Sequence, residues 1–290
     1  HRDLHISLRR QRQMCIRDRV SVILPSYNRS QSVGLAVESV LKQSFRDFEL
    51  CVVDDGSEDD TVEILDSIPG SFNTLRLKEN AGVSHARNCG IRSTDSEWIA
   101  FLDSDDVWHP QKLEKQIDAS SERPKYLLHF TDEIWIRNGK RINPKLRHQK
   151  REGWIFQPSL ELCLMAPSTV LLKRELLEQC GLFDEELPVC EDYDLWLRIT
   201  AHHQVSFLNE ALMTRSGGHA DQLSRKYWGM DRFRVQSLKK ILANVPLRKK
   251  DEMATRRVLK KKCEILLNGF RKRGKIKEIS YYEFLIKTHC

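Results

Sequence analysis

Three carboxylates stand within four positions of one another, directly after a short apolar run. The run extends from Trp98 to Leu102, and the acids are Asp103, Asp105 and Asp106. Such a run is typical of a buried parallel strand, and open α/β sheets bind ligands beyond the carboxyl ends of their strands. Neighbouring carboxylates repel one another, so they need a positive partner or altered pKa values. Mg²⁺ or Mn²⁺ is a natural partner, because both prefer oxygen ligands. The alternative for any single acid is a solvated turn.

A second pair of acids stands in the same kind of position. The segment Phe48 to Val53 is a candidate strand, and Asp54 and Asp55 follow it directly. An earlier β-branched run from Val20 is stopped by Pro25 and leads into a polar turn. The sequence therefore twice places carboxylates beyond the end of a candidate strand.

Strand and helix patterns alternate four times within about a hundred residues, which predicts βαβ units and a parallel sheet. We expect helices, from apolar spacing and caps, over 32–43, 59–68, 83–91 and 111–119, and a short strand around 75–77.

Beyond Pro124 the pattern changes. Asn138 and Gly139 form a strong hairpin signal after a strand candidate over 126–137. Later elements are a strand over 168–172, helices to 179 and over 191–201, and a last short strand over 205–208.

The net charge of +7 conceals an uneven distribution. Residues 225–290 hold 20 Lys and Arg against 6 Asp and Glu, whereas residues 20–224 carry an excess of acids. This basic tail has helical spacing over 227–242, 249–270 and 279–287. Its charge indicates either a solvated helix face or contact with an anionic membrane surface.

The ends and the cysteines bear on where the protein works. Residues 1–19 follow no strand or helix period, and we expect a non-native or disordered leader there. The eight cysteines are scattered without a CxxC pair, which suits a reducing cytoplasm and argues against a zinc site. We expect a cytoplasmic protein with peripheral contact at the inner face of the cytoplasmic membrane, since no apolar run is long enough to cross a bilayer.

Three segments together resemble a known family. They are VSVILPSYNRSQSVGLAVESVLKQSFRDFELCVVDDGSEDDT, then NAGVSHARNCGI, then WIAFLDSDDVW. Their order and spacing resemble those of family 2 glycosyltransferases with the GT-A fold, strongly over 20–119 and more loosely to about 220. The resemblance implies a Rossmann-like mixed α/β sheet flanked by helices over 20–224, with a basic helical extension over 225–290.

The resemblance also implies a donor site for a nucleotide-diphosphate sugar, most often a UDP-sugar. Pro25, Tyr27 and Asn28 would line the nucleotide pocket, and Asp55, together with Asp54, would bind the base or ribose. Tyr27 could instead simply pack at the mouth of the sheet.

The acidic triplet would be the family's DxD-type metal site. Asp105 and Asp106 would contact the Mn²⁺ or Mg²⁺ ion and the donor, while Asp103 would serve the ribose. Arg87 would lie near the diphosphate, or else on a helix surface. His219 would close over the diphosphate or ligate the metal.

An inverting transfer also needs a base that deprotonates the acceptor hydroxyl. The segment CEDYDLWLR resembles the family's ED motif, so Asp192 would be the base and Glu191 would orient it. Both acids could also cap the helix that they begin.

The chain lacks the QxxRW motif of processive synthases. A single-addition hexosyltransferase is therefore implied, with a lipopolysaccharide or other lipid-linked cell-envelope glycan as acceptor and no nucleic-acid partner. Two alternatives stay open: a catalytically inactive GT-A protein that binds glycan or nucleotide, and a DxD phosphatase.

Overall fold

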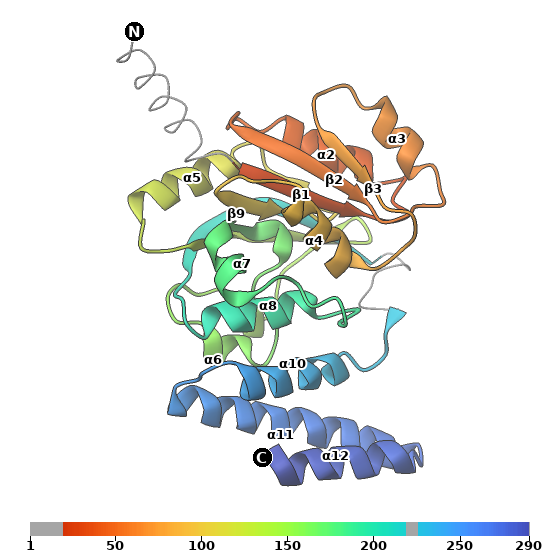
Figure 1. Ribbon diagram of the computed structural model, residues 1–290, viewed down its shortest axis with the longest axis vertical. Helices are drawn as coiled ribbons and strands as arrows, with labels where there is room; N and C mark the ends of the chain where they lie inside the picture. The colour runs from red at the N-terminus through yellow and green to blue at the C-terminus, as the bar shows by residue number, and fades with distance from the viewer. Residues whose placement is uncertain (1–19, 219–225, 290) are drawn as a thin grey trace.

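The computed structural model describes residues 20–218 and 226–289, whose arrangement Figure 1 shows. The segment 1–19 and His219 lie outside the described residues. Four parallel strands open the sheet in the spatial order β3-β2-β1-β4. Their bounds are Val20–Ser26 for β1, Phe48–Asp54 for β2, Asn73–Arg76 for β3 and Trp98–Phe101 for β4.

Helices connect these parallel strands, as the alternating pattern predicts. They are α2 (Val33–Leu41), α3 (Thr61–Ser67) and α4 (Val83–Arg92), and α5 (Lys112–Glu122) follows after β4. Helix α4 lies tightly on the sheet at Gly90, where an added Cβ would come within 2.5 Å of the Ile23 side chain. Glycine therefore lets α4 approach β1, and this close packing fixes the height of the α4 side chains above the sheet.

The sheet continues as a mixed one beyond β4. Strand β8 (Val170–Lys173) is antiparallel to both β4 and β6 (Leu128–Arg137). Strand β9 (Ser206–Gly217) runs parallel to β6 and antiparallel to the two-residue strand β5 (Val107–Trp108). The expected α/β class with a mixed sheet flanked by helices is confirmed.

The last strand of the sheet is longer than predicted. We expect a short strand over 205–208, whereas β9 extends to Gly217. After 208 the apolar run is only three residues long, from Ala211 to Met213, and polar residues follow it. Pairing with β6 satisfies the backbone groups of this segment, with two register shifts near Asp132. The hairpin between β6 and β7 (Lys140–Ile142) is as predicted, because Asn138 and Gly139 both adopt positive φ.

A second group of elements follows β7 in the chain, and its two longest helices pack into the same core cluster as α4. It comprises η1 (Leu146–His148), α6 (Phe156–Ser159), η2 (Pro167–Thr169), α7 (Arg174–Cys180) and α8 (Glu191–Thr200). The buried side chains of Leu195, Trp196 and Ile199 join α8 to the core beneath the sheet.

Three helices follow in the basic tail: α10 (Asp231–Asn244), α11 (Lys249–Lys272) and α12 (Ile276–His289). They lie in succession beyond α8 at one end of the molecule (Figure 1). Leu238 and Leu259 are fully buried in one cluster with Tyr193 and Leu197 of α8. The tail therefore shares a hydrophobic core with the segment that carries the ED motif.

Two further observations concern membrane and redox chemistry. No helix within residues 20–218 and 226–289 combines the length and the apolar character that crossing a bilayer requires. The six cysteines in these ranges are free thiols.

Candidate functional site

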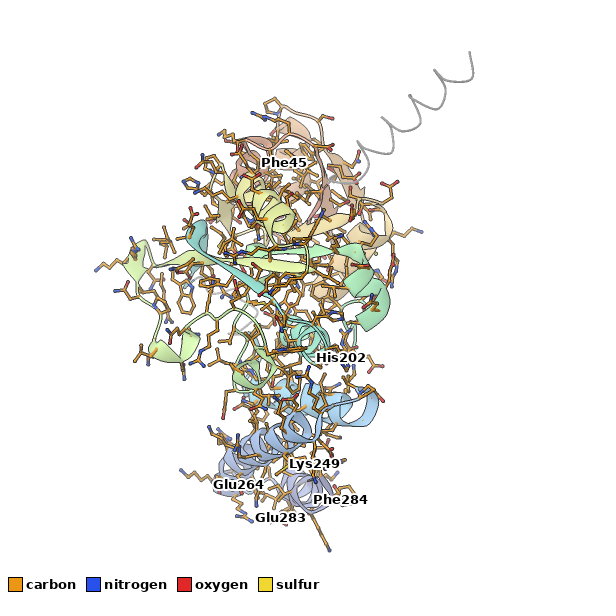
Figure 2. All side chains as sticks on the ribbon, turned by 90° about the vertical axis from the view of Figure 1, so that its left-hand side faces the viewer. Phe45, His202, Lys249, Glu264, Glu283 and Phe284 are labelled. Atoms are coloured by element: carbon orange, nitrogen blue, oxygen red, sulfur yellow. The ribbon has the colours of Figure 1, made fainter. Side chains whose placement is uncertain are left out.

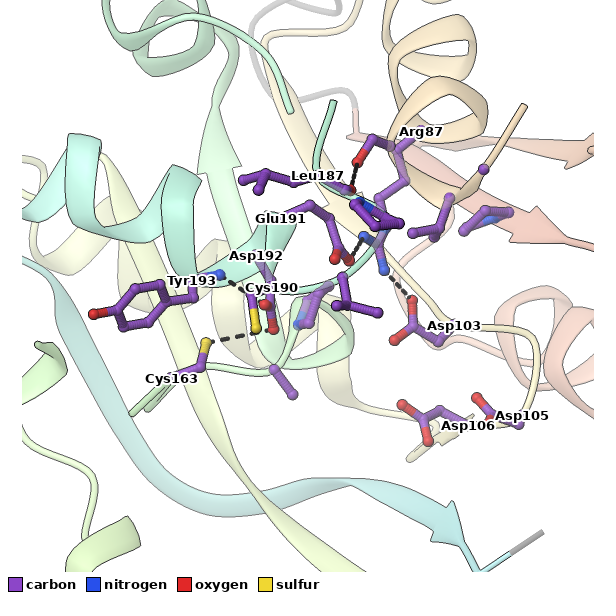
Figure 3. A pocket seen from close by; sticks show the side chains of 18 of the residues that line it. Arg87, Asp103, Asp105, Asp106, Cys163, Leu187, Cys190, Glu191, Asp192 and Tyr193 are labelled. Carbon is purple, nitrogen blue, oxygen red and sulfur yellow. Dashed lines mark hydrogen bonds and ion pairs between the residues drawn. The ribbon is translucent and has the colours of Figure 1, made fainter. Parts of the chain in front are cut away.

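A cleft of about 1120 Å³ opens at the carboxyl ends of β1 and β4 and reaches the start of α10. Figure 3 shows its acidic wall. The cleft brings together most of the residues singled out in the sequence: Pro25, Tyr27, Asn28, Asp55, Arg87, Asp103, Asp105, Asp106, Glu191 and Asp192.

Arg87 holds the two acidic segments of the cleft together. It projects from α4, and its guanidinium donates from Nη1 to Glu191 at 2.7 Å and from Nη2 to Asp103 at 2.6 Å. Arg87 is buried, with 2 % of its surface exposed, so it does not lie on a helix surface. Its predicted place near the diphosphate stays a prediction.

The Arg87 guanidinium, which Asp103 and Glu191 share, determines the charge balance on this side of the cleft. Burial alone would lower the pKa of Arg87, but Asp103 and Glu191 outweigh it and raise that pKa above its ordinary value. Burial raises the pKa of Glu191; Arg87 opposes this shift and the neighbouring Asp192 adds to it. Arg87 thus compensates the charge of two carboxylates, Glu191 and Asp103, that belong to different segments of the chain.

The acidic turn after β4 uses its carboxylates in different ways. Asp106 is buried and accepts hydrogen bonds from Ser168 Oγ at 2.7 Å and from the Ser216 amide at 3.2 Å. Burial, with the charges of Asp105 and Asp103, raises the pKa of Asp106. Asp105 is half-buried and lines the cleft.

This geometry bears on the predicted metal site. No group of three or more His, Cys, Asp or Glu side chains in the described parts of the chain is arranged to hold a metal ion. Asp103 is engaged by Arg87, and Asp106 is engaged by Ser168 and Ser216. The described residues do not form a preassembled metal site, so the contact of Asp105 and Asp106 with Mn²⁺ or Mg²⁺ stays a prediction.

The nucleotide end of the cleft is built by the turns after β1 and β2. Asn28 adopts the left-handed conformation with φ 50° and accepts a hydrogen bond from the Glu58 amide at 2.8 Å. Asp55 accepts from the Asn80 side chain and from the amides of Ala81 and Gly82 at 2.8–3.0 Å. A carboxylate has about four acceptor positions, so Asp55 retains capacity for one ligand donor.

Asp54 has a different place from Asp55. It is buried behind the cleft, is not among the lining residues, and accepts from the Ser57 amide at 3.2 Å. Its side chain supports the turn that carries Asp55, so direct contact with a nucleotide would need the turn to move.

The candidate base lies at the start of α8. Asp192 lines the cleft, and its Oδ2 accepts from the Cys163 thiol at 3.4 Å (Figure 3). The preceding Cys190 has φ 64° and ψ 20°, a left-handed conformation that costs about 1–2 kcal/mol for a residue with a side chain. Tyr193 anchors the helix from behind by donating to the Leu160 carbonyl at 2.6 Å. The start of α8 is therefore held in a fixed position that presents Asp192 to the cleft.

Several lining residues were not singled out in the sequence. Arg215 on β9 pairs in register with Trp135 on β6, and its guanidinium lies 5.9 Å from the Trp135 ring centroid. Burial would lower the pKa of Arg215, but nearby carboxylates, with Glu133 first and Asp106 second, raise it. The polar sequence after residue 208 carries no period that would indicate this strand. The start of the tail contributes four more lining residues: Lys226, Tyr227, Met230 and Arg234.

Comparison with solved structures agrees with the fold. The chain superposes on TarS 1-349 from S. aureus in complex with UDP-GlcNAc with a TM-score of 0.68 at 23 % identity, covering 87 % of this chain and 73 % of that one. It superposes on the mannosyltransferase PcManGT from Pyrobaculum calidifontis, in complex with GDP-Man and Mn²⁺, with a TM-score of 0.62 at 15 % identity, covering 94 % and 84 %. At these identities the likeness shows the fold alone.

Comparison of sequences identifies relatives. The chain is 34 % identical to the Escherichia coli protein WfgD, a UDP-Glc:alpha-D-GlcNAc-diphosphoundecaprenol beta-1,3-glucosyltransferase, over 66 % of this chain and 73 % of WfgD. It is 32 % identical to the uncharacterized glycosyltransferase RP339 of Rickettsia prowazekii, over 70 % of this chain and 65 % of RP339. Against two other Rickettsia relatives the chain spans about a third of their length, 32 % and 35 %.

A family model described as Glycosyl transferase family 2 matches residues 21–181, which is more than half of the chain. The matched segment contains the turns after β1, β2 and β4 and ends before the ED motif on α8. The chain therefore belongs to glycosyl transferase family 2.

Proposed function

We propose that the protein transfers a single sugar from a nucleotide-diphosphate donor to a hydroxyl of a cell-envelope glycan or lipid-linked acceptor. The observation that carries this proposal is the bridge from Asp103 through Arg87 to Glu191. It joins the acidic turn after β4 to the start of α8, so a donor site and a candidate base face one cleft. The arrangement suits transfer between two bound substrates.

The donor is a UDP-sugar in this proposal. Tyr27 and Asn28 line one end of the cleft, and Asp55 keeps an acceptor position for a base or ribose donor group. Both WfgD, by its name, and TarS, by its bound ligand, use a UDP-sugar. Arg215 would add a positive charge beside the diphosphate, since it lies among the carboxylates that face the cleft.

A divalent cation, Mn²⁺ or Mg²⁺, completes the donor site in this proposal. Asp105 would hold it, with Asp106 supporting the turn from the protein side, and His219 remains a predicted ligand. When bound, such an ion neutralises charge on the leaving nucleotide diphosphate. The PcManGT structure contains Mn²⁺, which supports this part of the proposal.

Asp192 acts as the base in the proposed transfer. Its carboxylate accepts the proton of the acceptor hydroxyl while that oxygen attacks the anomeric carbon, and attack opposite the leaving group inverts the configuration there. Glu191 is tied to Arg87, so it orients the start of α8 rather than taking the proton. The single thiol hydrogen of Cys163 can be donated to Asp192 Oδ2 at 3.4 Å or to the Met165 carbonyl at 3.2 Å.

The acceptor side of the proposal includes a membrane surface. WfgD acts, by its name, on a diphosphoundecaprenol-linked sugar. The basic tail of this chain exposes Tyr281 and Phe284 on α12, with 48 % and 60 % of their surfaces accessible. Aromatic side chains beside Lys and Arg suit the interface of an anionic membrane.

Calorimetric titration of UDP, GDP and dTDP, with Mn²⁺ and with EDTA, tests the donor site. We expect one nucleotide, UDP, to bind in a metal-dependent manner, and Asp105→Ala to abolish this dependence. Transfer is then measured with the matching nucleotide-sugar. Nucleotide binding without transfer or donor hydrolysis would support the inactive alternative, and absence of any nucleotide binding would contradict the proposal.

A further inference from the structure

The start of the tail forms the cleft wall beyond the candidate base. Tyr227, Met230 and Arg234 line this wall, whereas the family model ends at residue 181. The sulfur of Cys190, at the start of α8, lies 3.9 Å from the Met230 carbonyl oxygen. The wall therefore stands directly beside the segment that carries Asp192.

Arg234 provides the positive charge of this wall. Its side chain is 25 % exposed, and Nη1 donates to Asp231 Oδ1 at 3.0 Å. The Nε atom is buried and has no hydrogen-bond partner in the described parts of the chain. A guanidinium has five donor hydrogens, so Arg234 keeps donors for a bound anion.

The charge balance around Arg234 leaves a positive excess. Asp231 is the carboxylate that Arg234 contacts, and it also accepts from Lys262 Nζ at 3.0 Å. The Lys262 side chain is only 5 % exposed and also donates to the Glu161 carbonyl. One carboxylate therefore compensates two fixed cations, and the remaining charge is accessible at Arg234, on the cleft side.

The proposed donor cannot account for this charge. Figure 3 shows the acidic turn at Asp105, where the donor diphosphate would be held through a cation, on the other side of Arg87 from Cys190 and Tyr193. Arg234 belongs to the Cys190 side, because its amide donates to the Met230 carbonyl that Cys190 contacts. A second anion, carried by the other substrate, would meet Arg234. Tyr227 and Met230 beside it provide surface for a less polar group.

We propose that Arg234 binds a phosphate or diphosphate group of the acceptor and so positions the acceptor sugar against Asp192. This inference rests on the proposed function. A guanidinium matches phosphate oxygens with paired hydrogen bonds, which gives orientation as well as affinity. The site accordingly selects a sugar whose anomeric position carries phosphate, such as a sugar diphosphate attached to a lipid.

The test separates the acceptor anion from the donor anion. Protein is first saturated with UDP and Mn²⁺, and an α-N-acetylglucosaminyl diphosphate with a short alkyl chain is then titrated by calorimetry. The matching alkyl glycoside without phosphate, and inorganic phosphate, serve as separate arms. We expect the diphosphate to bind at least about tenfold more tightly than the glycoside, and Arg234→Gln to remove this difference. Arg234→Lys should restore part of it.

The matched control is Arg232→Gln on the same helix. Arg232 lies 3.9 Å from the Trp228 ring centroid and is not among the cleft-lining residues, so this variant should bind the diphosphate as the unaltered protein does. Equal binding of diphosphate and glycoside, or full diphosphate affinity in Arg234→Gln, would overturn the inference. Inorganic phosphate binding as tightly as the sugar diphosphate would overturn the role in acceptor positioning. Failure of UDP itself to bind would instead contradict the proposed function.

Discussion

Arg87 on α4 and Glu191 on α8 lie 104 positions apart in the sequence, and their side chains meet at 2.7 Å in the cleft wall. The same guanidinium reaches Asp103 after β4. A single buried cation thus fixes three separate segments relative to one another. The pairing explains how an acidic site can be held together before any ligand is bound.

Removal of the Arg87 side chain should lower the stability of the protein as well as its activity. Arg87→Ala leaves Glu191 and Asp103 without their partner, and breaking a buried pair costs about 3–5 kcal/mol. We expect a loss of this order in the free energy of unfolding, measured with urea. Arg92→Ala is the control on the same helix, because Arg92 is 58 % exposed and lies 3.7 Å from Glu185. An Arg87→Ala protein as stable as this control would contradict the bridging role.

The two acids at the start of α8 should differ in their kinetic effects. Asp192→Asn should lower kcat about 10²–10⁴-fold while leaving UDP affinity unchanged, because it removes the base and not the nucleotide contacts. Glu191→Gln weakens the pair with Arg87 and should lower stability together with activity. Steady-state kinetics and thermal unfolding of both variants measure this difference. Substantial transfer by Asp192→Asn would assign the base elsewhere.

Asp105 and Asp106 are neighbours with different environments. Asp106→Ala leaves the Ser168 hydroxyl and the Ser216 amide without their acceptor, which should cost about 1–3 kcal/mol of stability. Asp105→Ala should abolish metal-dependent UDP binding, because it removes the proposed ligand of the cation. Chemical unfolding and calorimetry on the two variants check this prediction. The reverse pattern would make Asp106 the ligand.

The burial of His129 predicts that the protein loses stability in acid. It is fully buried, and burial lowers its pKa to about 4, so the folded state resists protonation. The contribution of neutral His129 to the free energy of unfolding is fully present above pH 6.5, which is about the pKa of histidine in the unfolded chain. This contribution is lost as the pH falls towards 4, by about 3 kcal/mol in total.

Urea unfolding between pH 7.5 and 4 measures this effect. His129→Gln, which keeps an N–H donor for the Tyr126 carbonyl, should show a flatter pH dependence. Identical pH profiles for the two proteins would rule out His129 as the source.

The membrane contact can be tested without removing the tail. Deletion would expose the core that α10 and α11 share with α8, so surface substitutions are preferable. Figure 2 shows Phe284 on α12 at the opposite end of the molecule from Phe45. The double variant Tyr281→Ser and Phe284→Ser should bind anionic liposomes at least about tenfold more weakly. The reason is that it lacks the two aromatic side chains that would be buried in the lipid interface.

Leu35→Ser provides the matched control for this experiment. Leu35 is 62 % exposed on α2, far along the chain from the tail. The control should sediment with the liposomes as the unaltered protein does. Equal sedimentation of all three proteins would argue against docking through α12.

The sequence by itself determined the alternation of strands and helices and the position of the acids after β2 and β4. These features follow from local periodicity and from the apolar runs that end at Asp54 and Asp103, which neighbouring residues are sufficient to reveal. The length of β9 was not predictable in this way, because its polar second half is stabilised by pairing with β6.

Only the tertiary structure decided which of these acids face the cleft and with what partners. Asp55 lines the cleft while Asp54 lies behind it, since adjacent side chains leave a strand end in different directions. The partners of Arg87 and the approach of Arg234 to the start of α8 depend on contacts between segments far apart in the chain. Local sequence carries no signal for such contacts, because packing of the whole core sets the distances between those segments.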